Sequence, residues 1–160
     1  MVFGLTPKST AKLCALVQDH EKFQKEYLAV IAKPPAEKKG EMRDYLYHDK
    51  RLNKAFPTDG ARKGSKEAVL NYRVLGCSTR YTLVEVELLT GRHHQIRAQL
   101  SKIGCPIKGD LKYGAKRSNP DGGISLHSRR VEFVHPVKRE PVSITAPAPK
   151  DNLWEFFETM

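Results

Sequence analysis

Residues 90–114 read TGRHHQIRAQLSKIGCPIKGDLKYG, and this stretch restricts the fold and the function more than any other part of the chain. It follows a strand-like run at residues 81–89 and is interrupted by glycines at positions 91, 104, 109 and 114. Glycine allows backbone turns that other residues resist. The stretch therefore predicts a turn, a helix over residues 93–102, a short extended piece and two tight turns.

Three apolar residues of this expected helix, Ile96, Leu100 and Ile103, recur at helical spacing and should face the core. Arg97 then lies at the edge of the apolar stripe, where a charged side chain needs a carboxylate or a phosphate as its partner. On composition alone, a capped surface helix with solvated charges accounts for the same pattern and is the more ordinary interpretation.

The order of particular residues adds a second kind of information. T-G-R-x-H-Q-I-R followed by G-x-P-I-x-G-D-x-x-Y-G resembles the signature of the RluA-like family of RNA pseudouridine synthases. Lys25–Val30 is similar to the family's K-x-Y-x-A-x-V strand. Leu126-His127 and residues 131–136 resemble its L-H followed by a strand that ends in His-Pro. The resemblance covers about residues 1–145.

This resemblance implies an α+β fold of the pseudouridine synthase catalytic-domain type, with a mixed, largely antiparallel sheet and flanking helices. The implied activity is isomerisation of uridine to pseudouridine in structured ribosomal or transfer RNA. The reaction breaks and remakes the bond between ribose and uracil without a redox change, so it requires no cofactor. The target base would be flipped out of its stack into a pocket.

The resemblance also assigns roles to particular residues. Tyr27 and Arg97 are the implied catalytic residues, with Arg97 beside the family's aspartate, where a bidentate guanidinium keeps the acid ionised and oriented. The ordinary alternatives are a buried core tyrosine and a structural ion pair. The candidate RNA-binding residues are Arg92, His93, His94, Gln95, Lys102 and Lys108.

The family's catalytic aspartate is the exception to the match. The family carries it in an H-R-L-D-x-x-T-S-G segment, which this sequence does not contain. The most similar segment is Arg51-Leu52-Asn53, which has an amide where the family has the acid. It also lies downstream of Tyr27, so we interpret it as a loop. We therefore expect residues 1–160 to form a single catalytic domain, truncated at its N-terminus and inactive alone. The alternatives are a complete pseudoenzyme that binds RNA without modifying it and, third, a solvated domain with no RNA role.

Two structural consequences follow from this expectation. If Val2–Leu5 is the end of a strand whose neighbours are absent, the open edge should promote self-association or low stability. Arg97 should then take another acid or a bound anion as partner, because an unpaired buried charge is costly. Asp110 is the nearby candidate in the sequence.

The composition favours an anionic partner. The chain has 28 Lys and Arg against 18 Asp and Glu, a formal net charge of +10. No run is long enough for a transmembrane helix and the first residues are too short for a signal-peptide core, so we expect a cytoplasmic protein without membrane contact. Neither the three cysteines nor the histidines have the spacing of a common zinc site, so no metal is expected. These cysteines and histidines are Cys14, Cys77, Cys105, His93, His94, His127 and His135.

The remaining chain predicts an α+β alternation. Thr6 can cap a helix that runs from Pro7 to about Glu21. We expect Asn53–Ser65 to be a mobile basic loop. The other expected elements are strands at Phe23–Ala32 and Met42–Tyr47, a hairpin of Ala68–Leu75 with Tyr81–Leu89, a second hairpin of Ser125–Val134 with Pro141–Ala146, and a closing helix at Asn152–Glu158.

Overall fold

A computed structural model describes residues 4–19 and 22–160. Seven strands form one sheet in the order β3-β2-β4-β5-β1-β6-β7, and all six pairings between neighbours are antiparallel. The α+β fold is therefore confirmed. The elements are α1 (Pro7–Gln18), β1 (Phe23–Ile31), β2 (Lys39–Asp49), β3 (Lys54–Thr58), β4 (Ser65–Cys77), β5 (Thr82–Leu88), α2 (Gln95–Lys102), the 3-10 turn η1 (Leu111–Tyr113), β6 (Leu126–Val134), β7 (Pro141–Thr145) and α3 (Asn152–Glu158).

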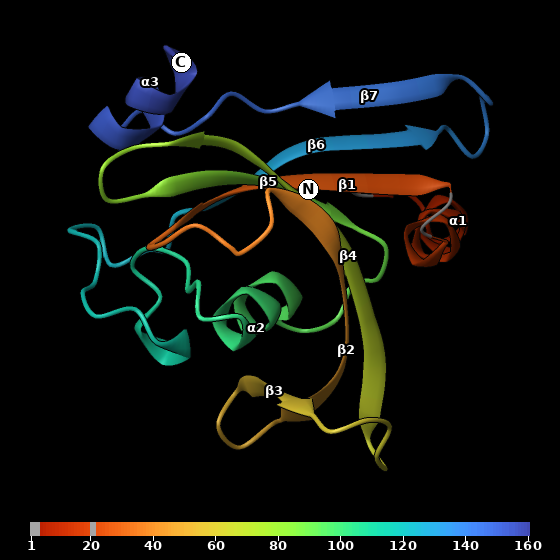
Figure 1. Cartoon of the computed structure of the whole chain (residues 1–160). Coiled ribbons are helices and arrows are strands. Elements are labelled where there is room, and N and C mark those ends of the chain that lie inside the picture. The colour runs from red at the N-terminus through yellow and green to blue at the C-terminus, as the bar shows by residue number, and fades with distance from the viewer. Residues whose placement is uncertain (1–3, 20–21) are drawn as a thin grey trace.

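The sheet bends around α2. In Figure 1, β2 and β4 curve past the helix, from β1 and β5 above it to β3 below it. Ile96 and Leu100 of α2 are buried in the main core, which also contains Leu70 of β4 and Val86 of β5. Ile103 was expected in the same stripe but is 42% exposed, because the helix ends at Lys102 and the chain turns away at Gly104.

The opposite face of the sheet carries a second core. Trp154 and Phe157 of α3 pack against Leu28, Val30 and Leu83. β1 is therefore covered on both faces near its end, which explains why residues 28–31 are all buried instead of alternating. Figure 1 shows α3 on the far side of the sheet from α2.

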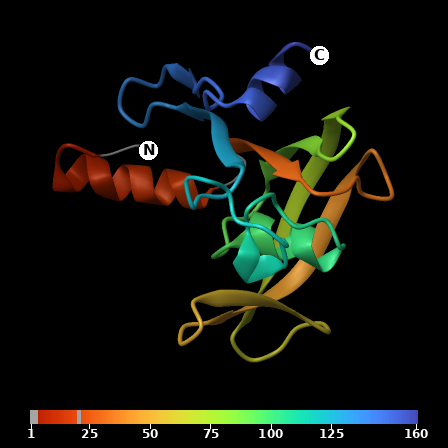
Figure 2. The same ribbon diagram turned by 90° about the vertical axis from the view of Figure 1, so that its left-hand side faces the viewer.

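α1 begins as expected. Thr6 and Ser9 form a reciprocal capping box, and Pro7 occupies the first turn. The helix ends at Gln18, earlier than the expected Glu21, which lies outside the described residues together with His20. The helix has no buried residue, and Figure 2 shows it projecting away from the sheet.

The expected strand at Val2–Leu5 is not found in its described part. Gly4 and Leu5 are not in a strand, and Val2 and Phe3 lie outside the described residues. Within the described chain, the two edges of the sheet are β3 and β7, and β1 is paired on both sides. An open edge next to β1 is therefore not present there.

The expected loop at Asn53–Ser65 is found in part, at residues 59–64, and was wrong for residues 54–58 before them. Lys54–Thr58 forms β3, which pairs with Tyr45–Asp49 of β2. Pro57 obscured this strand in the sequence, but proline is tolerated at a sheet edge, where its missing N–H faces solvent. The two hairpins and the helix at Asn152–Glu158 are confirmed, and β2 is longer at both ends than expected.

In the described part of the chain, no helix is both long and apolar enough to cross a membrane. The three cysteines are free, and only Cys105 is buried.

Candidate functional site

The turn into α2 is held by Gln95. Its side chain is 2% exposed, and its Oε1 accepts hydrogen bonds from Thr90 Oγ1 at 2.7 Å and from the Arg92 N–H at 2.9 Å. Its Nε2 donates to the Val69 carbonyl at 3.0 Å. Gln95 therefore fastens the start of the helix to β4. Gln95 is one of the candidate RNA-binding residues, and its side chain lies in the interior.

The residue before it, His94, has a left-handed backbone with φ 52°. This conformation is uncommon for residues other than glycine, although histidine is one of the residues enriched in it. Gly91 was expected to provide the turn, yet the positive φ falls on His94. The surroundings must hold this backbone in place, and strain of this kind often accompanies functional sites.

Arg97 and Asp110 form a bidentate ion pair. Arg97 Nε donates to Asp110 Oδ2 and Arg97 Nη2 donates to Asp110 Oδ1, each at 2.8 Å. The Asp110 side chain is 1% exposed and that of Arg97 is 19% exposed. The hydrogen bond to Asp110 raises the pKa of Arg97, so the guanidinium stays charged. The expected pairing of Arg97 with Asp110 is thus confirmed.

Tyr113 joins this ion pair to the rest of the fold. Its ring lies 4.8 Å from the Arg97 guanidinium carbon, measured to the ring centroid. Its hydroxyl accepts a hydrogen bond from the Ala55 N–H at 2.8 Å and contacts His94 Nδ1 at 2.8 Å. Burial raises the pKa of Tyr113, so this hydroxyl remains neutral. The buried Tyr113 therefore connects η1, the start of α2 and β3.

Three imidazole rings stack beside Tyr113. The ring centroids of His48 and His93 are 3.8 Å apart, as are those of His93 and His94. Burial, followed by the charge of Arg97, lowers the pKa of His94 to about 4. Burial also lowers the pKa of His93, with His48, Arg97 and Lys112 acting in the same direction. The stack therefore lies in a region of positive potential.

The other candidate RNA-binding residues already have partners in the protein. Lys102 forms an ion pair with Asp44, and Lys108 Nζ donates to Asn119 Oδ1 at 2.6 Å. Arg92 Nε donates to the Glu67 carbonyl at 2.7 Å. Of these residues, Arg92, His93 and His94 lie together at the start of α2, whereas Lys108 lies on the segment after the helix.

Tyr27 lies on the same face of the sheet as α2. Its ring packs against the core cluster that contains Ala29, Val86 and Ile96. Among the hydrogen bonds of the described residues, none connects Tyr27 with Arg97. The two implied catalytic residues thus belong to the same side of the sheet, and no hydrogen bond joins them among the described residues.

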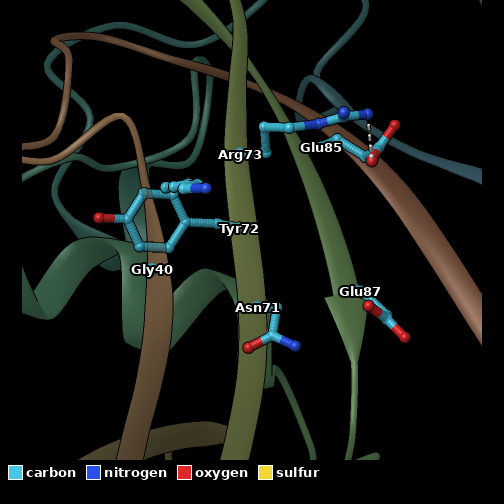
Figure 3. Close-up of a pocket in the computed structure, with 7 residues that line it drawn as sticks. Gly40, Asn71, Tyr72, Arg73, Glu85 and Glu87 are labelled. Carbon is cyan, nitrogen blue, oxygen red and sulfur yellow. Dashed lines mark hydrogen bonds and ion pairs between the residues drawn. The ribbon is translucent and has the colours of Figure 1, made fainter.

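Two pockets differ sharply in charge. One of about 390 Å³ lies between β3, α2 and η1, and Lys54, Lys102 and Lys112 line it together with Tyr113. The other, of about 470 Å³, is lined by Arg73, Glu85 and Glu87 among others. Figure 3 shows Arg73 directed toward Glu85, to which it is ion-paired, and Glu87 lies farther along the same strand. Of these two pockets, only the first has no acid in its described lining, and its charge suits RNA.

Sequence reasoning missed several residues of the site. Tyr113 and Asp110 belonged to the recognised motif but received no role in the site beyond a possible pairing of Asp110. His48 received no role from its sequence context, and Lys54 belongs to the segment expected to be a basic loop. A strand assigned at residues 54–58 would have placed His48 and Lys54 next to α2. The reason is that β3 pairs with the end of β2.

Comparisons with known proteins agree with the motifs. A family model described as RNA pseudouridylate synthase matches residues 1–102. An uncharacterized RNA pseudouridine synthase of Chloroflexus aurantiacus is 37% identical over 138 residues, covering 84% of this chain and 42% of the relative. The ribosomal large subunit pseudouridine synthase D of Xylella fastidiosa is 39% identical over 99 residues, covering 54% of this chain and 30% of the relative. The chain thus spans less than half the length of these relatives.

Solved structures support the fold. The human RNA pseudouridylate synthase domain containing 4 superposes with a TM-score of 0.75 at 21% identity, covering 94% of this chain and 67% of that chain. The fold is therefore that of a pseudouridine synthase domain. The family model and the relatives place the chain in a class of RNA-modifying isomerases. The chain belongs to the RNA pseudouridylate synthase family, and the resemblance to its RluA-like members is confirmed.

Proposed function

We propose that this chain forms the tyrosine- and arginine-bearing part of an enzyme that isomerises uridine to pseudouridine in structured ribosomal or transfer RNA. The observation that carries the proposal is the environment of Arg97. A guanidinium has five N–H donors, and Arg97 uses one at Nε, one at Nη2 and one at Nη1. Two donors remain, and the side chain is partly exposed. A second carboxylate can therefore bind the Arg97 guanidinium, which Asp110 and His94 already hold in place.

The surrounding chemistry suits the reaction. A carboxylate must attack the sugar or stabilise it after the bond to the base breaks, and a neighbouring group must move a proton. Tyr27 supplies a hydroxyl and an aromatic ring on the face of the sheet that α2 covers. An extruded uracil can stack on such a ring. We propose that the chemistry needs no cofactor and that the protein acts in the cytoplasm.

We further propose that the 160-residue chain does not turn over RNA by itself. It contains no H-R-L-D-x-x-T-S-G segment, so no aspartate occupies the family's nucleophile position in its sequence. Asp110 does not replace it, because this carboxylate is 1% exposed and both its oxygens are engaged by Arg97.

One observation favours the second candidate function, an RNA-binding pseudoenzyme. Asp110 already neutralises Arg97, so the ion pair is complete without a further acid. In that case the chain would bind RNA through its basic surface and leave the uridine unchanged. Both functions therefore predict RNA affinity, and they differ only in whether uridine is converted to pseudouridine.

The deciding experiment incubates cellular RNA with three proteins and maps pseudouridine at single-nucleotide resolution. The first is this chain, the second is the chain fused at its amino end to a segment carrying H-R-L-D-x-x-T-S-G, and the third is that fusion with asparagine for the aspartate. We expect new pseudouridine only with the second protein. Its activity should be lost with Arg97→Met. Turnover by the 160-residue chain alone would contradict the proposed dependence on the added segment, and a folded but inactive fusion that binds RNA favours the pseudoenzyme.

A further inference from the structure

A small cationic pocket lies beside the histidine stack, on the side away from Asp110. It encloses about 170 Å³ and is lined by side chains from β2, β4 and the turn before α2, including His48, Lys66, Arg92 and His93. Sites for drug-sized molecules usually measure about 300–1,000 Å³, so this pocket is too small for a whole nucleotide. Its size suits a compact group such as a phosphate.

The lining carries positive charge without an acid to offset it. Lys66 and Arg92 are the two cations, and no Asp or Glu is among the described residues that line the pocket. Glu67, next to Lys66 on the strand, pairs instead with Arg43, on the opposite face of the sheet. The cationic side chains are therefore not neutralised from within.

The residues that line this pocket keep part of their hydrogen-bonding capacity unused within the described protein. Arg92 is held by its Nε bond to the Glu67 carbonyl, and within the described residues neither of its terminal nitrogens has a hydrogen-bond partner. Nε2 of His48 and Nε2 of His93 are both buried, and neither has a partner. Buried polar atoms are normally satisfied, so the two rings that line this pocket retain unused hydrogen-bonding capacity.

We infer that His48, Lys66, Arg92 and His93 form a binding pocket for one phosphate group of an RNA strand, separate from Arg97 and Asp110. The identity of the ligand rests on the proposed function, because an RNA substrate is what supplies the phosphate. A phosphate offers several acceptor oxygens, and charge-assisted hydrogen bonds from arginine to phosphate are strong. The fixed Nε of Arg92 leaves its terminal nitrogens free to take two of these oxygens.

The first test titrates inorganic phosphate into the full chain at constant pH and ionic strength, and follows the imidazole signals by NMR. We expect saturable shifts at His48 and His93, with His127 and His135 unchanged as internal controls. Lys66→Gln should weaken the apparent affinity by roughly threefold to tenfold. Lys63→Gln removes an equal charge three residues away, from a residue outside the pocket lining, and should leave the affinity unchanged. Equal effects of the two variants, or no shift at His48 and His93, would overturn the inference.

The second test measures the affinity of the chain for a single-stranded RNA oligonucleotide over a range of salt concentrations. Each neutralised phosphate contributes about 0.7 to the slope of log affinity against log salt for single strands, so Lys66→Gln and Arg92→Gln should each lower the slope by up to about that amount. Arg73→Gln, on the opposite face, should not change it. A slope unaffected by Lys66→Gln would show that RNA places no phosphate in the pocket. If the chain binds no RNA at all, the proposed function fails, and the phosphate titration still decides whether the pocket binds this anion.

Discussion

Arg97 donates a hydrogen bond from Nη1 to Nε2 of His94, 3.0 Å away, and this contact fixes the protonation of the imidazole. A guanidinium has no acceptor, so Nε2 of His94 must accept and cannot carry a proton. The ring hydrogen therefore lies on Nδ1, which donates to the Tyr113 hydroxyl at 2.8 Å. A doubly protonated His94 would lose the bond to Arg97 and place two cations in contact.

This relationship predicts how stability depends on pH. The pKa of His94 is about 4 in the folded chain, against an ordinary value of 6.5. The unfolded chain therefore binds the proton more readily between these values, and stability must fall as pH falls from about 6.5 to about 4. We expect urea unfolding to show this loss, and His94→Gln to reduce it. His135→Gln, outside the stack, should retain the full pH dependence, and an unchanged dependence in His94→Gln would contradict the assignment.

A second prediction concerns the buried ion pair. Asp110→Asn leaves the Arg97 charge without its counterion in a mostly buried position, so we expect a loss of about 3 kcal/mol in the free energy of unfolding. The exposed pair between Arg73 and Glu85 provides the comparison, since Arg73→Gln should cost less than about 1 kcal/mol. Urea unfolding of both variants at neutral pH measures the difference. Equal costs would mean that burial of Asp110 contributes little.

A third prediction separates a structural role of Gln95 from RNA contact. Gln95→Met removes three hydrogen bonds and leaves the Arg92 N–H unsatisfied, so we expect a loss of roughly 2 kcal/mol or more. The salt dependence of RNA binding by the folded variant should not change. Gln24→Met, at an exposed position of β1, serves as the control and should alter stability by less than about 0.5 kcal/mol. A lower salt slope in Gln95→Met would instead support the assignment of Gln95 to the RNA-binding residues.

A fourth prediction concerns self-association. We expect the chain to associate through the edge strand β7, where Ile144 is 51% exposed, because unpaired backbone groups and apolar side chains promote strand pairing. β3 is the weaker candidate because Pro57 removes a donor from that edge. Light scattering over a range of protein concentrations should show association that Ile144→Lys reduces. Leu111→Lys, at a residue of similar exposure outside the sheet, should not reduce it, and a monodisperse monomer at every concentration would contradict the prediction.

The sequence alone was sufficient for much of the fold. Alternation of apolar residues predicted both hairpins, because a strand with one buried face repeats every two residues. Thr6 and Pro7 predicted the start of α1. The first N–H groups of a helix have no partner within the helix; the Thr6 side chain accepts a hydrogen bond from one of them, and Pro7 has no N–H to satisfy. β3 was missed because its strand character depends on pairing with β2, and its own residues resemble a basic loop.

The sequence by itself determined the family, the apolar residues of α2 and the need of Arg97 for an anionic partner, because these follow from residue order, periodicity and the cost of burying a charge. Only the tertiary structure decided where the polar side chains point. It turned Gln95 into the interior, joined Arg97 to His94 and Tyr113, and brought His48 from β2 against His93. These contacts bridge segments far apart in the chain, and hydrogen bonds over such separations depend on how the sheet bends around α2, which no local pattern of residues specifies.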